Sequence, residues 1–86
     1  MKRTVFFISD STGITAEAVG HSLLSQFEGI DYKQERVPFV DTLDKARECE
    51  RRIAKARQRD GLRPVVVTTL VDPAIVSIIH EADALF

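Results

Sequence analysis

The sequence of 86 residues has little of what marks several classes of protein. Its single cysteine, Cys49, excludes an internal disulfide and a zinc site made of cysteines, and is typical of a reducing cytoplasm. The two histidines, His21 and His80, lie far apart and predict no metal site. The apolar run Thr4–Ile8 ends at Ser9-Asp10, too early for a signal peptide, and no run is long enough to span a membrane. We therefore expect a cytoplasmic protein with no metal and no membrane partner.

The net charge is only −1, but the charges are unevenly distributed. Between Lys45 and Arg63, eight lysines or arginines stand against three acids, so this stretch carries about +5. A basic helix could bind nucleic acid or an acidic protein. No aromatic residue is interleaved with these charges, as a binder of single strands would need. The favoured interpretation is a solvated helix face with ion pairs one turn apart, such as Glu48 with Arg52, and no nucleic acid partner.

Three apolar runs alternate with three helical patterns. We expect strands at Thr4–Ser9, Tyr32–Val40 and Pro64–Leu70, and helices at Ile14–Phe27, from Asp41 or Thr42 to Gly61, and from Asp72 onward. Pro38 cannot donate to a sheet, so its strand belongs at an edge, whereas the first strand is apolar throughout and belongs at the centre. The order then predicts an α/β fold: a three-layer open parallel sheet, half of a flavodoxin- or Rossmann-like fold, with strand order 2-1-3 and helices on both faces.

Apolar stripes on the helices predict the core. They are Ala16, Val19, Gly20, Leu23, Leu24 and Phe27; Leu43, Ala46, Cys49, Ile53 and Ala56; and Ile75, Ile78, Ile79, Ala82 and Leu85. In the order 2-1-3 the apolar third strand has no outer neighbour, and no C-cap glycine follows the third helix. We therefore expect residues 1–86 to form one βαβαβα domain, the first part of a longer protein, and to form a homodimer through the open edge or the terminal helix.

The most informative segment is the hydroxyl-rich turn between the first predicted strand and helix. Its candidate phosphate-binding residues are Ser9, Asp10, Ser11, Thr12, Gly13 and Thr15. A helix N-terminus favours an anion through its free N–H groups and its dipole, and Gly13 permits a tight turn and close approach. The alternative is a plain helix cap, since Ser, Thr and Asp are also preferred N-cap residues. The turn is neither a Walker P-loop, because no Gly-Lys-Ser/Thr follows, nor a dinucleotide fingerprint, because it has one glycine.

The predicted strand order also places this turn in the fold. It creates a switch point between the first and third strands, and open α/β sheets bind ligands at the carboxyl ends of strands there. The loop Asp10–Gly13 and the loop Thr69–Asp72 are therefore expected to converge on one crevice, with Thr69 and Asp72 as its other candidates. Asp10 stands at the strand end, where it could orient a nucleophile, hold magnesium or cap the helix.

The remaining reactive side chains are interpreted as structural. Glu17 and His21 lie one turn apart on the outer side of the first helix and could form a base or half a metal site, but an exposed surface pair is the favoured interpretation. His80 has no expected partner beyond its neighbour Glu81. Cys49 lies on an apolar stripe, which favours a buried structural thiol over a nucleophile. No residue is assigned a catalytic role.

One long motif resembles a known family. Ile8-Ser9-Asp10-Ser11-Thr12-Gly13-Ile14-Thr15-Ala16-Glu17, followed by Gly20-His21 and Gln26-Phe27, closely resembles the phosphoenolpyruvate synthase and pyruvate, phosphate dikinase regulatory proteins. Val37-Pro38-Phe39-Val40 and Arg63-Pro64-Val65-Val66 resemble the same family in the same order. The resemblance implies bifunctional cytoplasmic enzymes that use ADP to phosphorylate a threonine of the dikinase or synthase. It also implies removal of that phosphate with inorganic phosphate, which releases pyrophosphate.

The family's P-loop, with its Gly and Lys-Thr, has no counterpart in these 86 residues. The resemblance therefore implies the N-terminal domain of a kinase/pyrophosphorylase that is inactive alone, and that binds no cofactor of its own. ADP and phosphate would serve the longer protein, whose partner would be the dikinase or the synthase. One alternative is a non-catalytic binding or dimerisation module of that protein. Another is a flavodoxin-like carrier, since Thr12-Gly13-Ile14-Thr15 resembles the flavodoxin phosphate loop.

Overall fold

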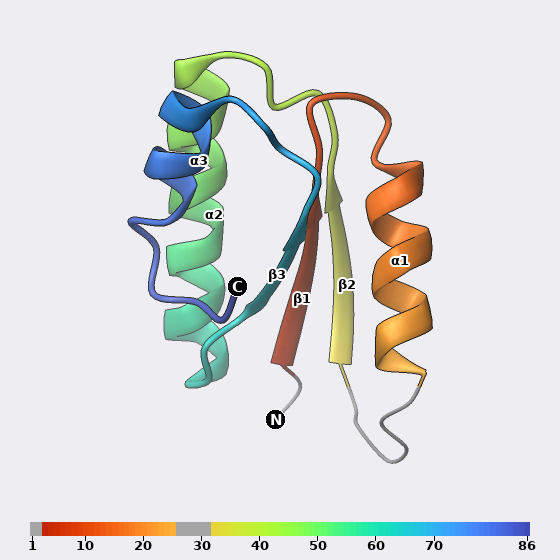
Figure 1. The fold of residues 1–86 in the computed structure, drawn as a ribbon. Helices are drawn as coiled ribbons and strands as arrows, with labels where there is room; N and C mark the ends of the chain where they lie inside the picture. The colour runs from red at the N-terminus through yellow and green to blue at the C-terminus, as the bar shows by residue number, and fades with distance from the viewer. Residues whose placement is uncertain (1–2, 26–31) are drawn as a thin grey trace.

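The computed structural model describes residues 3–25 and 32–86, in which strands and helices alternate (Figure 1). The elements are β1 (Arg3–Ile8), α1 (Ile14–Leu24), β2 (Tyr32–Val37), α2 (Leu43–Asp60), β3 (Val65–Thr68) and α3 (Pro73–Ile79). The strands are parallel in the order β2-β1-β3, which confirms the predicted open α/β sheet. None of the helices in the described ranges is long and apolar enough to cross a membrane.

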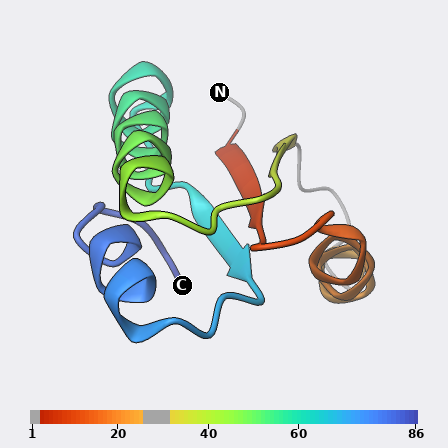
Figure 2. The same cartoon turned by 90° about the horizontal axis from the view of Figure 1, so that it is seen from above.

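The central strand β1 supplies both layers of the core. Successive side chains of a strand point to opposite faces, so Phe6 and Ile8 pack against α2 and α3 while Val5 and Phe7 face α1. Figures 1 and 2 show α1 on one side of the sheet and the other two helices on the opposite side, as predicted. Because the three strands run in one direction, the loops that follow them gather at one end of the sheet.

The helix α1 lies close to the sheet because one of its residues has no side chain. A Cβ at Gly20 would overlap the ring of Phe7, which is itself buried. Among the α1 residues whose side chains the structure describes, those that face the sheet are spaced by four: Ala16, Gly20 and the half-buried Leu24. The helix α1 therefore contacts the sheet through a narrow row of residues, and it is the helix that covers this face of the three strands.

Three side chains expected in the core are instead exposed: Val19 (50%), Leu43 (56%) and Leu85 (40%). Val19 lies beside the narrow stripe of α1 rather than on it. Leu43 is the first residue of α2 and precedes the first buried residue, Ala46. Ala82 is buried as predicted, but α3 has already ended at Ile79. The expectations for the Leu23 side chain and for Phe27 lie outside the described residues.

The strand β2 ends at Val37, three residues before the predicted end at Val40. Pro38 has no N–H for the sheet, and Phe39 has a left-handed backbone with φ 59°. The Phe39 amide donates instead to the Ser11 carbonyl, at 2.8 Å. The chain thus leaves the sheet at Pro38 and pairs with the loop after β1. The edge position predicted for this strand is confirmed.

The predicted helix signals are largely confirmed. Thr42, rather than Asp41, is the N-cap of α2, and its hydroxyl accepts from the Lys45 amide at 3.2 Å. Gly61 ends this helix with φ 68°, a conformation that glycine adopts without strain. Asp72 caps α3, with Pro73 at its first position.

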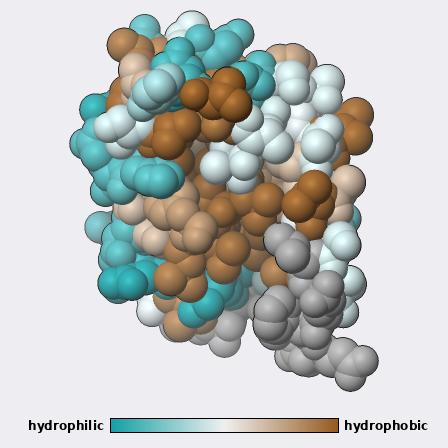
Figure 3. Space-filling view, viewed as in Figure 1, coloured by the Kyte–Doolittle hydropathy of each residue, from teal (hydrophilic) through white to brown (hydrophobic). Residues whose placement is uncertain are grey.

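The third strand was expected to have no outer neighbour, and this expectation is wrong. Leu85 forms a parallel bridge with Val65, through hydrogen bonds from the Val66 amide to the Leu85 carbonyl and from the Leu85 amide to the Pro64 carbonyl, both 2.8 Å. Two residues earlier, Asp83 pairs with Arg57 of α2 at 3.2 Å. Figure 3 shows apolar surface down the middle of the molecule, between α1 and α3.

Candidate functional site

The buried hydroxyl of Ser9 joins two of the loops at the carboxyl ends of the strands. Ser9 is 2% exposed, and its Oγ accepts from the Ser11 amide at 3.1 Å and from the Thr69 hydroxyl at 3.2 Å. The Thr69 amide also donates to the Ile8 carbonyl, at 3.2 Å. Ser9 is therefore placed to hold loops together, and the expected approach of Thr69 to the first loop is present. Asp72 instead uses its carboxylate on its own helix, where it accepts from the Ala74 amide at 2.9 Å.

Backbone hydrogen bonds tie the third loop, after β2, to the same segment. The Ser9 amide donates to the Val37 carbonyl at 3.1 Å, and the Ser9 carbonyl accepts from the Val40 amide at 2.9 Å. Together with the bond from Phe39 to Ser11, these bonds fix residues 9–11 along the connection to α2. The first loop is held by its neighbours, which is what preorganised binding of a ligand requires.

The N-terminus of α1 differs from those of the other two helices. The residue before its first turn is Gly13, with φ 83° and no side chain to act as a cap. The Gly13 carbonyl accepts the first helical bond, from the Glu17 amide at 3.0 Å. Within the described ranges, no side-chain oxygen accepts from the amides of Ile14, Thr15 or Ala16. These amides lack a protein acceptor at a helix end whose dipole is positive, which favours an anion there.

Polar side chains surround this helix end. Asp10, Ser11, Thr12 and Thr15 are exposed, so three hydroxyls and one carboxylate are accessible to a ligand. Gly13 itself is buried. The structure thus places four of the six predicted loop residues at the surface and two, Ser9 and Gly13, beneath it.

Arg36, near the end of β2, is the residue that sequence reasoning missed. A Cβ at Gly13 would lie 3.2 Å from the Cγ and Cδ atoms of Arg36, so the arginine stem lies along the loop backbone. Its guanidinium pairs with Glu17 at 3.3 Å and remains half exposed. No local pattern marks Arg36, but its place one residue before the end of an edge strand in a 2-1-3 sheet puts it beside the first loop. A cation at this position adds to the attraction for an anion.

Four exposed apolar side chains occur on the loops and helix ends that follow the strands: Ile14 (64%), Phe39 (52%), Leu43 (56%) and Val71 (80%). Phe39 also has a left-handed backbone, which is strained for phenylalanine. All four lie at the end of the sheet where open α/β folds bind ligands.

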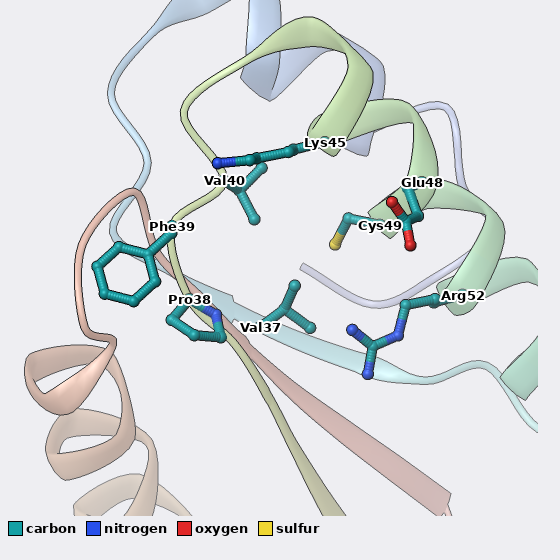
Figure 4. A pocket seen from close by; sticks show the side chains of 8 residues that line it. All are labelled: Val37, Pro38, Phe39, Val40, Lys45, Glu48, Cys49 and Arg52. Atoms are coloured by element: carbon teal, nitrogen blue, oxygen red, sulfur yellow. The ribbon is translucent and has the colours of Figure 1, made fainter.

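A hollow of about 170 Å³ lies between the end of β2 and α2 (Figure 4). The Cys49 sulfur points into it, among Val37, Val40 and the side chains of Lys45 and Arg52. Burial raises the pKa of the Cys49 thiol to about 11, so the thiol stays protonated at neutral pH. The predicted burial of Cys49 is confirmed, since it is 1% exposed.

The two histidines contact aromatic rings. His21 meets the edge of Phe7 with ring centroids 5.6 Å apart, and His80 lies 4.2 Å from Phe86. Glu17 pairs with Arg36 rather than with His21, so the expected surface pair on α1 is replaced by a contact to β2. In the part of the chain that the structure describes, no three His, Cys, Asp or Glu side chains cluster as metal ligands would.

Three arginines of α2 pair with acids outside that helix. Arg47 pairs with Glu81 at 3.2 Å, Arg52 with Glu35 at 3.6 Å, and Arg57 with Asp83. Arg63 reaches Asp83 too, at 2.9 Å. The predicted pairing of Arg52 with Glu48 one turn away is wrong, because the acid of β2 lies within reach. Most of the cations of this stretch are exposed, as expected of a solvated face, and the absence of a nucleic acid partner stays a prediction.

Comparisons with known proteins agree with one another. Residues 5–85 match the family model described as Kinase/pyrophosphorylase. A protein of Aromatoleum aromaticum is 61% identical over 98% of this chain, and one of an Azoarcus species is 58% identical over the same share. A protein of Bordetella pertussis is 46% identical over the whole chain. All three are provisionally named phosphoenolpyruvate synthase regulatory protein, and the chain spans 30%, 30% and 31% of their lengths. The chain therefore belongs to the kinase/pyrophosphorylase family.

Proposed function

We propose that this chain is the N-terminal domain of a cytoplasmic regulatory protein that acts on phosphoenolpyruvate synthase or pyruvate, phosphate dikinase. The longer protein would use ADP to phosphorylate a threonine of that target. It would use inorganic phosphate to remove the phosphate, releasing pyrophosphate. Family membership and the names of the relatives support this proposal. Because the chain spans 30% of those relatives and carries no P-loop, the nucleotide would bind in the remainder.

Within this activity, we assign the loop Ser9–Thr15 to phosphate binding. The observation that carries the assignment is the N-terminus of α1, where Gly13 replaces a capping side chain and leaves the first amides without acceptors. The hydroxyls of Thr12 and Thr15 can add donors to phosphate oxygens, and Arg36 adds a positive charge. Ser9 acts through its neighbours, as a positioning residue. Asp10 is the one acid of the loop, and a variant at this position tests whether its carboxylate takes part.

Titration of inorganic phosphate into isotope-labelled protein tests the assignment directly. We expect the amide signals of Gly13 and Thr15 to shift first, because their N–H groups lie at the uncapped helix end. The matched controls are the amides of Lys45 and Ala74, which already donate to the caps Thr42 and Asp72. If those control amides shift as much, or if the loop does not respond, the loop is not a phosphate site.

A second candidate role is docking of the target enzyme, with the chemistry elsewhere. The four exposed apolar residues Ile14, Phe39, Leu43 and Val71 favour it, since they lie at the same end of the molecule. The full-length relative of Aromatoleum aromaticum, altered at the positions that match Asp10 and Thr12, separates the two. Lost turnover with target binding intact indicates phosphate handling, whereas lost binding indicates docking. A change at the position of Phe39 is the complementary variant and is expected to affect binding alone.

A further inference from the structure

The chain runs beside the outer edge of β3 as a strand would. The bridge of Leu85 to Val65 is parallel, and its two hydrogen bonds, both 2.8 Å, have the geometry of a sheet. Leu85 thus pairs with β3 where a fourth parallel strand would begin, although this single bridge does not make a strand.

Only half of this edge is used. The backbone groups of a strand alternate between its two sides, and the Thr69 amide points to β1 while the Val66 amide points to Leu85. By this alternation the Val66 carbonyl and the Thr68 amide also point outward. In the described part of the chain neither has a backbone partner on that side. A strand that continued past Leu85 in the same direction would reach both groups.

The connection through α3 fits the start of such a strand. Parallel neighbours are joined by right-handed crossovers, and two crossovers that run in the same direction across a sheet place their helices on the same face. The helix α3 packs beside α2 on one face, with Ile75 and Ile79 in the same core as Ile53. The path from β3 through α3 to Leu85 therefore has the required hand.

The composition of β3 fits a central strand rather than an edge. Val66 is buried on the side of α2, and Val65 and Val67 are half buried on the side of α1. Natural edge strands are protected by charges, prolines or bulges, and the segment Val65–Thr68 carries none of these. The apolar surface in Figure 3 lies over this part of the molecule.

We propose that the outer edge of β3 is the docking site of a fourth parallel strand, which begins at Leu85 and gives the sheet the order 2-1-3-4. The occupant is the segment that follows the counterpart of Phe86 in the longer relatives, of which this chain spans 30%. The strand would pair with the Val66 carbonyl and the Thr68 amide. This edge would then join the domain to the rest of the protein.

Amide hydrogen exchange in the full-length Aromatoleum aromaticum protein tests this proposal. The position that matches Thr68 faces the proposed strand, and the position that matches Val67 faces β1 and is the internal control. We expect the two amides to be protected to within about tenfold of each other, and both to lose protection only with global unfolding. If the Thr68 counterpart exchanges at least about a hundredfold faster than the control, the edge is free and the proposal is wrong. Protection that disappears on dilution assigns the edge to a second copy and also overturns the proposal.

Proline variants of the same protein give an independent readout. Proline at the position of Thr68 removes an outward N–H, and proline at the position of Val67 removes one that points to β1. If a strand docks, both variants lower the melting temperature strongly. If the Thr68 variant melts close to the unaltered protein while the Val67 variant does not, no strand pairs at this edge.

Discussion

At the scale of single residues, Gly20 controls how closely α1 approaches the sheet. It is the point at which the helix meets the ring of Phe7, and a methyl group has no room there. Elsewhere in a helix, Gly to Ala is favourable by about 1 kcal/mol, because alanine has the higher helix propensity. At this position the sign is reversed by packing.

We expect Gly20→Ala to lower the free energy of unfolding by about 2 kcal/mol, since overpacking displaces a buried aromatic ring. Ser22→Ala, exposed on the same helix, is the matched control and should change stability by less than about 0.5 kcal/mol. Urea denaturation followed by circular dichroism measures both. Equal or greater stability of the Gly20 variant would contradict the close packing of α1.

A second residue-scale feature lies at the opposite end of the sheet. The buried carboxylate of Asp60 accepts from the Thr4 hydroxyl at 2.7 Å and from Arg59 Nε at 3.0 Å. The hydrogen bond from Arg59, together with that from Thr4, lowers the pKa of Asp60 below its ordinary value. The last residue of α2 is thereby fastened to β1.

This cluster predicts how stability depends on pH. A carboxyl whose pKa is lowered on folding stabilises the protein above its unfolded pKa of about 3.9, and the contribution is lost as pH falls through the folded value. We expect Asp60→Asn to melt below the unaltered protein at pH 7, and the gap to narrow below about pH 4. Melting curves from neutral to acidic pH measure the gap. Glu48→Gln, an exposed change on the same helix, is the control and should leave the melting temperature unchanged at each pH. A difference for Asp60→Asn that persists into acid would be inconsistent with the lowered pKa.

At the scale of elements, the helices differ in what satisfies their first amides. Thr42 and Asp72 cap α2 and α3 through their side chains, whereas α1 begins at a glycine. The hydroxyls of Thr12 and Thr15 therefore hold no amide of this helix, whereas that of Ser9 is engaged by Ser11 and Thr69. Phosphate binding by this loop stays a prediction.

We expect Thr42→Ala to destabilise the protein by about 1 kcal/mol through the lost cap. Thr12→Ala should change stability by less than about 0.5 kcal/mol, because its hydroxyl holds no helical amide. Denaturation midpoints of the two variants, compared at equal m-value, give the difference. A loss at Thr12 as large as at Thr42 would assign its hydroxyl to capping.

Local signals explain which elements were predictable. Pro38 identified the edge strand, and Asp72-Pro73 and Gly61 marked helix ends, because each acts on the backbone within a few residues of itself. The exposure of Val19 and the role of Arg36 depend on how elements pack and on strand register. No pattern within one segment carries that information.

Some features of the candidate site were likewise predictable from the sequence and others were not. The sequence indicated a hydroxyl-rich loop at a helix N-terminus, and Thr12 and Thr15 are exposed there. It did not indicate that Ser9 is buried and bonded to Thr69, since that contact joins residues sixty positions apart. Leu85 escaped prediction for the same reason, because its partner is an edge and not a neighbour in sequence.

At the scale of the whole molecule, the open half of the β3 edge bears on self-association. Leu85 occupies one half, while the other half and the exposed ring of Phe86 (51%) stay accessible. An open apolar edge is a template for pairing with a second copy. The homodimer predicted from the sequence remains a prediction for this chain. Because Leu85 already pairs with part of the edge, we expect the association to be weaker than at a fully open edge.

We expect concentration-dependent dimers of the 86-residue chain in light scattering across a dilution series. Thr68→Lys, which puts a charge at the open part of the edge, should shift the equilibrium toward monomer. An arginine-to-lysine change at Arg51, exposed on α2, is the control and should leave the equilibrium unchanged. A monomer at the highest attainable concentration would mean that Leu85 alone protects the edge.

The buried hydroxyl of Ser9 has a consequence for how such domains diversify. Because one side chain and its backbone groups bond to the segments after β1, β2 and β3, a foreign segment that changes the backbone path or lacks the Thr69 hydroxyl would break a buried bond. A chimaera that receives one foreign loop is expected to bind and fold worse than one that receives all three. The end of the sheet would then be inherited as a single module, with Ser9 as its shared anchor.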